Sequence, residues 1–330
     1  MNMEKEIKRF GNLCIKTQEE LKVYLHRFLM SNGYKVVNED GFLYAKGTLP
    51  YLVTAHMDTV HLKQCNRYSV HNYSGKHRIQ SPVGIGGDDR CGIYMIVRMI
   101  LDGYRPTVLF CEDEEIGSVG ATKFTYTEYV DDLKELNYFI ELDRANANDA
   151  VFYDCDNPKF TEFILDNSGY KKATGSFTDI VELSDATGIA SVNFSCGYYN
   201  PHREKEYVIF EEMMDTIKMV EGLLDIKDCE QFEFIRVKRQ FYPYEDYFWC
   251  KNYFGNEYDC YEKYSNYNSY NSMYDDEEVT VYLEVTFNDN IKCKENTAGF
   301  YGKSEEECFY NFFLSYPYAC LNDVIDYNVY

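Results

Sequence analysis

The chain has 330 residues, more than most single domains hold, and 45% of them are hydrophobic, which is enough for a packed core. Its 55 acidic and 33 basic side chains give a formal net charge of −22, which repels phosphate backbones and disfavours nucleic-acid binding. There is no run of about 18 apolar residues, and Met1–Phe10 has no apolar core, so we expect neither a membrane span nor a secretion signal.

Helices and strands alternate along the first two thirds of the chain. In chain order we expect a helix from the capping box at Thr17 to about Gly33, a hairpin of 34–37 and 42–45, a strand at 51–55, a helix at 89–102, a strand at 107–111, a helix at 119–124, strands at 137–142 and 150–153, a helix at 178–187, a strand at 189–195 and an amphipathic helix at 209–226. Segment 160–165 fits a strand or a short helix equally well. This alternation predicts an α/β fold with a mixed, mostly parallel sheet sandwiched by helices.

The composition changes after residue 226. We therefore assign 1–226 to the main domain, which we expect to be catalytic, and 227–277, which is rich in Tyr, Asn and Asp, to a linker or arm. Residues 278–330 predict a small α+β module of unknown role, with a strand at 278–287 and a helix at 304–313. The twelve cysteines include no Cys-x-x-Cys pair, so we expect free thiols in the cytoplasm rather than a structural zinc knuckle.

One short string carries the strongest chemical signal. The predicted strand at 51–55 runs directly into His56-Met57-Asp58, which puts an imidazole at the carboxyl edge of the sheet with a carboxylate two residues away. A histidine that binds a metal needs such a partner on its far ring nitrogen. The sequence therefore predicts His56 as a metal ligand and Asp58 as the residue that orients its ring.

Four further candidate ligands follow later in the chain, most of them just past predicted strands. They are Asp88, which follows Gly84-Ile85-Gly86-Gly87, then Glu115, Asp143 and His202. A carboxylate on a glycine-rich turn can bridge two cations, while one terminal carboxylate and one histidine complete the shell of each ion. This set leaves a position for water, as a catalytic zinc site requires. We therefore expect two Zn²⁺ per chain, although Co²⁺ or Mn²⁺ suit the same ligands.

Glu114 precedes Glu115 and is predicted to have a different role. Adjacent side chains cannot both point at the same ion, so one of them binds the metal and the other is left beside the water that bridges the two ions. Water on a metal ion has a pKa of roughly 7, so a carboxylate can finish its deprotonation. We predict Glu114 as the general base.

Each of these motifs also has an ordinary explanation. A lone His-x-Asp is more often a surface pair, and a lone Glu-Glu is usually a solvated helix start. Their joint occurrence after successive strands favours the metal site. Nearby, we expect Arg90 to have a structural role, Cys91 and Cys111 to be small core residues, and His61 to be an ordinary polar residue, with contact to substrate as the alternative.

These motifs resemble those of the co-catalytic two-zinc exopeptidases, a group that includes peptidase T, the glutamate carboxypeptidase (carboxypeptidase G) and aminoacylase enzymes, and the bacterial leucyl aminopeptidases. The matching pieces are 55–59, 86–92, 113–117, 141–143 and 197–202, with 177–179 and 206–208 as further parts of the pattern. The resemblance covers about residues 15–226. It implies the zinc-exopeptidase (phosphorylase/hydrolase-like) fold, the same five ligands and base, and a cis peptide bond between Asp88 and Asp89. Many of these enzymes insert a lid or dimerisation domain before the final histidine, whereas the short Asp143–His202 separation here implies a lidless domain.

We therefore predict a zinc-dependent exopeptidase, specifically an aminopeptidase that hydrolyses short peptides through a metal-bridging water activated by Glu114. One alternative is an N-acyl amino acid deacylase or carboxypeptidase-type hydrolase. The other is a non-catalytic, metal-bound scaffold with a binding module at its C-terminal end, and the intact Glu114 argues against it. The expected partner is a peptide substrate, with no nucleic acid and no membrane, and the sequence leaves the oligomeric state open.

Overall fold

The computed structural model describes residues 2–175, 177–226 and 229–237, together with three strands further along the chain. The chain divides into two compact units, Met1–Lys238 and Arg239–Tyr330. The first unit extends beyond residue 226, where we expected the main domain to end. Segment 229–237 belongs to this unit because Phe232 is buried in its core and Glu233 pairs with Ile189 in an isolated β-bridge.

An eight-stranded sheet forms the centre of the first unit. Its strands are β1 (Val37–Glu39), β2 (Phe42–Ala45), β3 (Tyr51–His56), β6 (Thr107–Cys111), β7 (Tyr138–Arg144), β8 (Asp149–Val151), β9 (Lys171–Ala173) and β10 (Ser191–Ser195). They are arranged in the order β1-β2-β6-β3-β7-β10-β8-β9. The four central strands β6, β3, β7 and β10 are parallel, whereas β2 pairs with β6 and β8 pairs with β10 in antiparallel fashion. The predicted mixed, mostly parallel sheet is confirmed.

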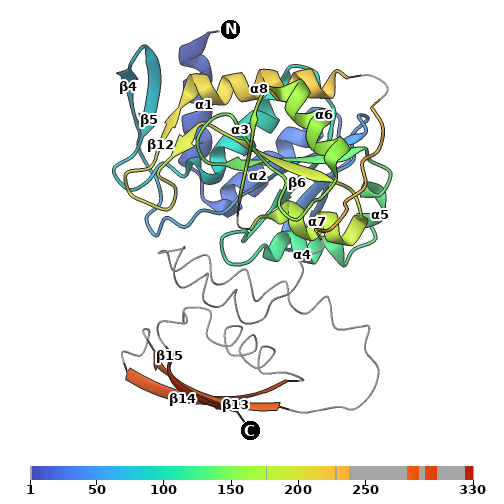
Figure 1. Ribbon diagram of the computed structural model, residues 1–330. Helices are drawn as coiled ribbons and strands as arrows, with labels where there is room; N and C mark the ends of the chain where they lie inside the picture. The colour runs from blue at the N-terminus through green and yellow to red at the C-terminus, as the bar shows by residue number, and fades with distance from the viewer. Residues whose placement is uncertain are drawn as a thin grey trace. The chain divides into compact units, whose positions relative to one another are not determined.

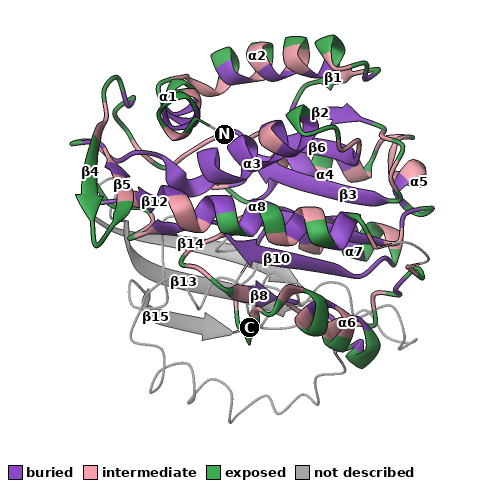
Figure 2. Cartoon of the chain, turned by 90° about the horizontal axis from the view of Figure 1, so that it is seen from above, coloured by how far each residue is buried: buried purple, intermediate pink, exposed green. Residues whose placement is uncertain are grey.

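Helices cover both faces of this sheet (Figure 1). On one face lie α1 (Met3–Cys14), α2 (Gln18–Ser31), α3 (Gly87–Leu101), α6 (Pro158–Ser168) and α8 (Phe210–Leu224), and on the other lie α4 (Val119–Thr125), α5 (Val130–Leu133) and α7 (Asp179–Thr187). Alternate residues of a strand point to opposite faces, so Val53 belongs to the first core cluster and Leu52 to the second. Strands β3, β6 and β10 are buried along their whole length, as Figure 2 shows.

The first predicted helix begins and ends where the sequence indicated. Thr17 accepts a hydrogen bond from the backbone N–H of Glu20 (3.2 Å), and Glu20 accepts one from the N–H of Thr17 (3.1 Å), which is the predicted capping box. Gly33 follows the helix with a φ of 88°. The undecided segment 160–165 lies inside α6, whose first turn is fixed by Asn157 and Pro158.

Several elements of the first unit were not predicted from the sequence. Three of them are helices α1 and α5 and strand β9. The others form a small antiparallel sheet, ordered β11-β12-β5-β4 and made of β4 (Ser69–Tyr73), β5 (Lys76–Gln80), β11 (Tyr198–Tyr199) and β12 (Tyr207–Ile209). The connection between β11 and β12 carries His202. In the part of the chain that the structure describes, no helix is both long and apolar enough to cross a membrane.

The second unit contains an antiparallel sheet in the order β14-β13-β15, made of β13 (Val281–Asp289), β14 (Lys294–Gly302) and β15 (Val324–Val329). Strand β13 overlaps the strand that we expected at 278–287. The helix expected at 304–313 and most of the 227–277 arm lie outside the described residues.

Helix α3 meets β7 through a glycine, and this contact gives a first testable prediction. A Cβ atom at Gly92 would lie 2.0 Å from the carbonyl oxygen of Leu142 and 2.6 Å from a carboxylate oxygen of Asp89. Because backbone on both sides must move to admit a methyl group, we expect Gly92→Ala to cost about 1–3 kcal/mol or more of the free energy of unfolding. Thermal unfolding measures the loss.

The matched control for this substitution is Gly222 in α8. No atom lies within 4 Å of the Cβ position there, so Gly222→Ala brings only the better helix propensity of alanine. We expect it to raise the free energy of unfolding by up to about 1 kcal/mol. Equal effects of the two substitutions would contradict the tight α3–β7 contact.

Candidate metal centre

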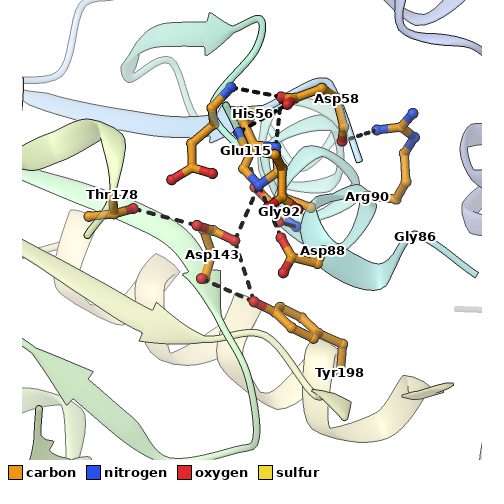
Figure 3. A network of polar contacts seen from close by, with 12 residues as sticks. His56, Asp58, Gly86, Asp88, Arg90, Gly92, Glu115, Asp143, Thr178 and Tyr198 are labelled. Carbon is orange, nitrogen blue, oxygen red and sulfur yellow. Dashed lines mark hydrogen bonds and ion pairs between the residues drawn. The ribbon is translucent and has the colours of Figure 1, made fainter. Parts of the chain in front are cut away.

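The central parallel strands deliver most of the candidate ligands to one edge of the sheet. His56 is the last residue of β3, and Asp143 lies near the end of β7. Glu114 and Glu115 follow the end of β6, and Asp88 lies in the first turn of α3. Carboxyl ends of parallel strands are where α/β proteins place their sites. The five predicted ligands, from segments far apart in sequence, converge here. Figure 3 shows four of them, His56, Asp88, Glu115 and Asp143.

The ligand atoms form two groups that share Asp88. In the first group, Nε2 of His56 lies 3.0 Å from Oδ1 of Asp88 and 3.5 Å from Oδ1 of Asp143. In the second, Nε2 of His202 lies 3.2 Å from Oδ2 of Asp88 and 3.3 Å from Oε2 of Glu115. Within each group all ligand atoms lie within 4.8 Å of one another, so each group can hold one metal ion. Asp88 offers one oxygen to each group, which is the arrangement of a bridging carboxylate.

Asp58 organises the site without belonging to either group. Its Oδ1 lies 3.1 Å from Nδ1 of His56, so Nδ1–H can donate to it and leave the lone pair of Nε2 facing Asp88. The same carboxylate accepts hydrogen bonds from the backbone N–H groups of Glu114 and Glu115, both at 3.0 Å. Asp58 therefore fixes both the ring of His56 and the backbone of the Glu114–Glu115 pair.

Glu114 is a buried residue, 9% exposed, whose carboxylate is close enough to His56, Asp143 and Glu115 to feel their charges. Burial raises its pKa well above the ordinary value, and the negative charges of Asp143 and Asp179 raise it further, while His56 opposes them. A buried carboxylate with a strong affinity for a proton suits a group that accepts and returns protons.

The donor set fits divalent cations. Oε1 of Glu115 is buried and has no hydrogen-bond partner, which is costly for a carboxylate unless a cation satisfies it. Three carboxylates and two imidazoles crowd one place that is buried on the His56 side and open on the His202 side, and cations there would offset the repulsion between the carboxylates. Nitrogen and carboxylate ligands with no thiolate suit Zn²⁺, Co²⁺ or Mn²⁺.

Buried polar groups hold the backbone of Asp143 in place. Its N–H donates to Oδ1 of Asn193 (2.9 Å), and the hydroxyl of Tyr198 donates to its carbonyl (3.2 Å; Figure 3). The hydroxyl of Thr178 donates to Glu141 and lies 3.4 Å from Oδ2 of Asp143. No role was predicted for these three residues. Thr178 and Tyr198 lie in the matching pieces 177–179 and 197–202, and Asn193 is a polar residue inside an apolar strand.

The residues that follow Asp88 have structural roles. The peptide bond between Asp88 and Asp89 is cis, as the resemblance implied. Asp89 is fully buried and accepts hydrogen bonds from the N–H groups of His56 (3.2 Å) and Gly92 (2.8 Å). The guanidinium of Arg90 donates to the carbonyls of Met57 (2.7 Å), Asp58 (3.2 Å) and Lys16 (3.3 Å), so it ties the loop after β3 to α3. Cys91 and Cys111 are core residues, as expected.

Metal binding should depend on pH, because four of the ligands hold protons in the absence of ions. Burial raises the pKa of Glu115 to about 8 and that of Asp143 to about 7, and the hydrogen bond with Asp88 raises the pKa of His202 to about 9. Burial alone lowers the pKa of His56, but the charge of Asp143 outweighs it and raises this pKa well above the ordinary value. Ions bind the deprotonated forms, so apparent affinity will be greatest above about pH 9 and will fall as the pH drops through about 9 to 7.

Calorimetric titration of the metal-free protein with Co²⁺, in buffers with different ionisation enthalpies, checks this prediction. The number of protons released per ion should increase as the pH is lowered from about 8 to about 6. If affinity and proton release do not change over this pH range, the ligand side chains are not protonated in the metal-free protein as we expect.

The chain is similar to known proteins in structure but matches none in sequence. A scan against protein-family models found no match, and neither did a search of curated protein sequences. Among solved structures, the chain is similar to the aminopeptidase PepT from Bacillus cereus ATCC 10987, with a TM-score of 0.53, 15% identity, and coverage of 68% of this chain and 98% of that one. A tripeptidase from Staphylococcus aureus subsp. aureus mu50 gives a TM-score of 0.54 at 12% identity, with the same coverage.

A third similar structure is described as a Zn-dependent exopeptidase, from Parabacteroides distasonis ATCC 8503. It has a TM-score of 0.50 and 14% identity, and the likeness covers 68% of this chain and 98% of that one. The chain has the zinc-exopeptidase fold. The fold that the resemblance implied is therefore confirmed. In this version of the zinc-exopeptidase fold, the segment between Asp143 and His202 forms only β8, α6, β9, α7, β10 and β11 among its described residues.

Proposed function

We propose that the protein is a zinc-dependent exopeptidase, most specifically an aminopeptidase that hydrolyses short peptides with two Zn²⁺ per chain. The observation that carries this proposal is the shared Asp88, whose two oxygens each face a separate histidine–carboxylate group. Two adjoining cation sites with one shared carboxylate are typical of two-metal hydrolytic centres. A single structural ion would need only one of the two ligand groups, and it would not need a buried carboxylate such as Glu114 beside it.

In the proposed hydrolysis, the residues of the site have separate roles. When bound, the two ions would polarise the scissile carbonyl and lower the pKa of a coordinated water. Asp58 keeps His56 and the Glu114 backbone in place. Glu114 accepts a proton from the attacking water, whose oxygen forms the new bond to the carbonyl carbon. As the C–N bond breaks, Glu114 passes that proton to the leaving amine, so atoms and charge balance.

The similar structures favour an aminopeptidase over the related hydrolases, and Glu114 favours an enzyme over a scaffold. The similar structures include an aminopeptidase and a tripeptidase, both of which act on peptides by name. The intact Glu114, buried beside the ligands, supports turnover rather than a scaffold.

The seven cysteines in the described part of the chain are all free, which supports our proposal of a cytoplasmic enzyme.

The proposal is tested with matched substrates. The Zn²⁺-loaded protein is assayed on tripeptides with a free α-amino group and on the same tripeptides with an acetylated one, while elemental analysis gives the metal content. We expect two ions per chain and release of the first residue from the free-amine peptides only. Release of acetate from the acetylated peptides alone would instead identify a deacylase, and release of the last residue from both sets would identify a carboxypeptidase. No cleavage of either set by protein with two bound ions would overturn the proposed function.

A further inference from the structure

Glu206 is a buried glutamate next to the candidate metal centre. The sequence predicted no role for it. Glu206 lies in the connection between β11 and β12 and is 0% exposed. Its Oε2 accepts hydrogen bonds from the backbone N–H of Gly86 (2.8 Å) and from Nε2 of His61 (2.7 Å). Its Oε1 accepts a hydrogen bond from the backbone N–H of Asp88 (3.0 Å). Every polar contact of this carboxylate therefore ends on a loop of the site.

Close packing leaves the glycine-rich loop little freedom around this carboxylate. A Cβ atom at Gly87 would lie 2.8 Å from Cβ of Tyr198 and 3.3 Å from Oε1 of Glu206. A Cβ atom at Gly84 would lie 2.2 Å from the ring of His61. The glycines that precede Asp88 therefore let the loop lie directly against β11 and against the His61–Glu206 pair.

Glu206 connects two ligands that reach the site from different directions. Asp88 comes from the start of α3, and His202 comes from the β11–β12 connection, in which Glu206 itself lies. By bonding to the N–H of Asp88, the carboxylate fixes the backbone of the shared ligand against the segment that carries His202. His202 is 46% exposed on its side chain and has a φ of 59°, so this segment gains little support from the core at His202 itself.

We propose that Glu206 is a positioning residue for the second metal site, the group of Asp88, Glu115 and His202, and that His61 assists it. This inference rests on the proposed function, because it requires that the two groups bind metal. Hydrogen-bonded groups behind metal ligands set ligand orientation, and their loss typically weakens metal binding about 10–100-fold.

The contacts explain why the residue must be a carboxylate. Both oxygens face backbone N–H groups, which can only donate. The amide of a glutamine would direct its NH₂ group at the N–H of Gly86 in one orientation and at the N–H of Asp88 in the other. Glu206→Gln is therefore nearly the same size but leaves two donors facing each other, which a buried site does not tolerate.

The experiment is a titration of the metal-free chain with Co²⁺, followed by calorimetry and by the visible absorption of the bound ion. We expect the wild-type protein to bind two ions, and Glu206→Gln to bind the second about 10–100-fold more weakly. His61→Ala should weaken the second ion less, because the two backbone contacts remain. His61→Gln should restore it, because the amide nitrogen of glutamine can take the place of Nε2.

The matched control is Glu6→Gln. Glu6 is also buried, at 4% exposure, and its carboxylate accepts hydrogen bonds from Arg9 and Tyr94 away from the site. We expect this variant to lose stability but to bind both ions normally.

The results of this titration distinguish a failure of the positioning role of Glu206 from a failure of the proposed function. Wild-type protein that does not bind two ions overturns the proposed function. Wild-type protein that binds two ions, with Glu206→Gln and His61→Ala binding both equally well, overturns the positioning role alone. An equal loss in Glu6→Gln would also overturn it, because the effect would then come from any buried glutamate. If Glu206→Gln fails to fold, the His61→Ala and His61→Gln pair decides the matter: weakening by the first and recovery by the second support the role, and wild-type affinity in both overturns it.

Discussion

Replacing Glu114 with glutamine will remove peptide hydrolysis while both metal ions stay bound. Glu114 belongs to neither ligand group, and its backbone is held by the hydrogen bond from its N–H to Asp58, which the substitution leaves intact. The amide cannot accept a proton at neutral pH, so the step that activates water is lost. General-base catalysis typically contributes about 10²–10⁴-fold to the rate, and we expect kcat to fall by at least this much. Steady-state kinetics and metal analysis on the same sample measure both effects.

Glu112 provides the matched control in the same acidic run. Its carboxylate pairs with Lys22 and accepts a hydrogen bond from the N–H of Gly41 (2.9 Å), so it serves to hold α2 and the β1–β2 turn. Glu112→Gln should lower thermal stability and leave kcat per bound metal close to that of the wild type. If Glu114→Gln retains wild-type kcat, the base has been wrongly assigned. If it loses its metal instead, Glu114 is a ligand.

Replacing Asp88 with asparagine will have the largest effect on metal content. Each oxygen of Asp88 serves a different group, so the substitution removes a charged ligand from both sites at once. We expect the affinity for both ions to fall by more than the roughly 100-fold that marks the upper range for supporting residues. Elemental analysis after dialysis should find neither ion at concentrations that saturate the wild-type protein.

The terminal ligands give the comparison for Asp88→Asn. Asp143 belongs only to the first group and Glu115 only to the second. Asp143→Asn and Glu115→Gln should therefore each weaken one ion more than the other and leave partly loaded protein. If Asp88→Asn also loses only one ion, the carboxylate does not bridge, and the two groups are independent sites.

The convergence of the candidate ligands was predictable because they come with local signals in the sequence. His56 and Asp143 end buried strands, and Asp88 follows a run of glycines, so sequence and topology together bring them to one edge. The hydrogen bonds behind the ligands had no such signal, because they join segments that are distant in sequence. Glu206 closes the charged run 203–206, which reads as a solvated turn, yet its side chain is fully buried.

The fold was predictable where hydrophobic periodicity is strong and unpredictable where charge or short length hides it. Helix α1 is rich in charged residues, although Ile7, Phe10 and Leu13 are buried at helical spacing. Strands β11 and β12 are too short to show a repeating pattern, and they are stabilised by pairing with each other and with β5. Tertiary contacts, rather than local propensity, determine these elements.

The two imidazoles of the centre differ greatly in accessibility: the side chain of His56 is 1% exposed, whereas that of His202 is 46% exposed. An ion on the inner side can leave only after buried structure opens, but an ion on the outer side has a direct path to solvent. In the proposed two-metal centre the cations should therefore have unequal residence times. A chelator will strip the outer one first, and soaking that half-loaded protein in a different metal will yield a defined hybrid with a different element in each position.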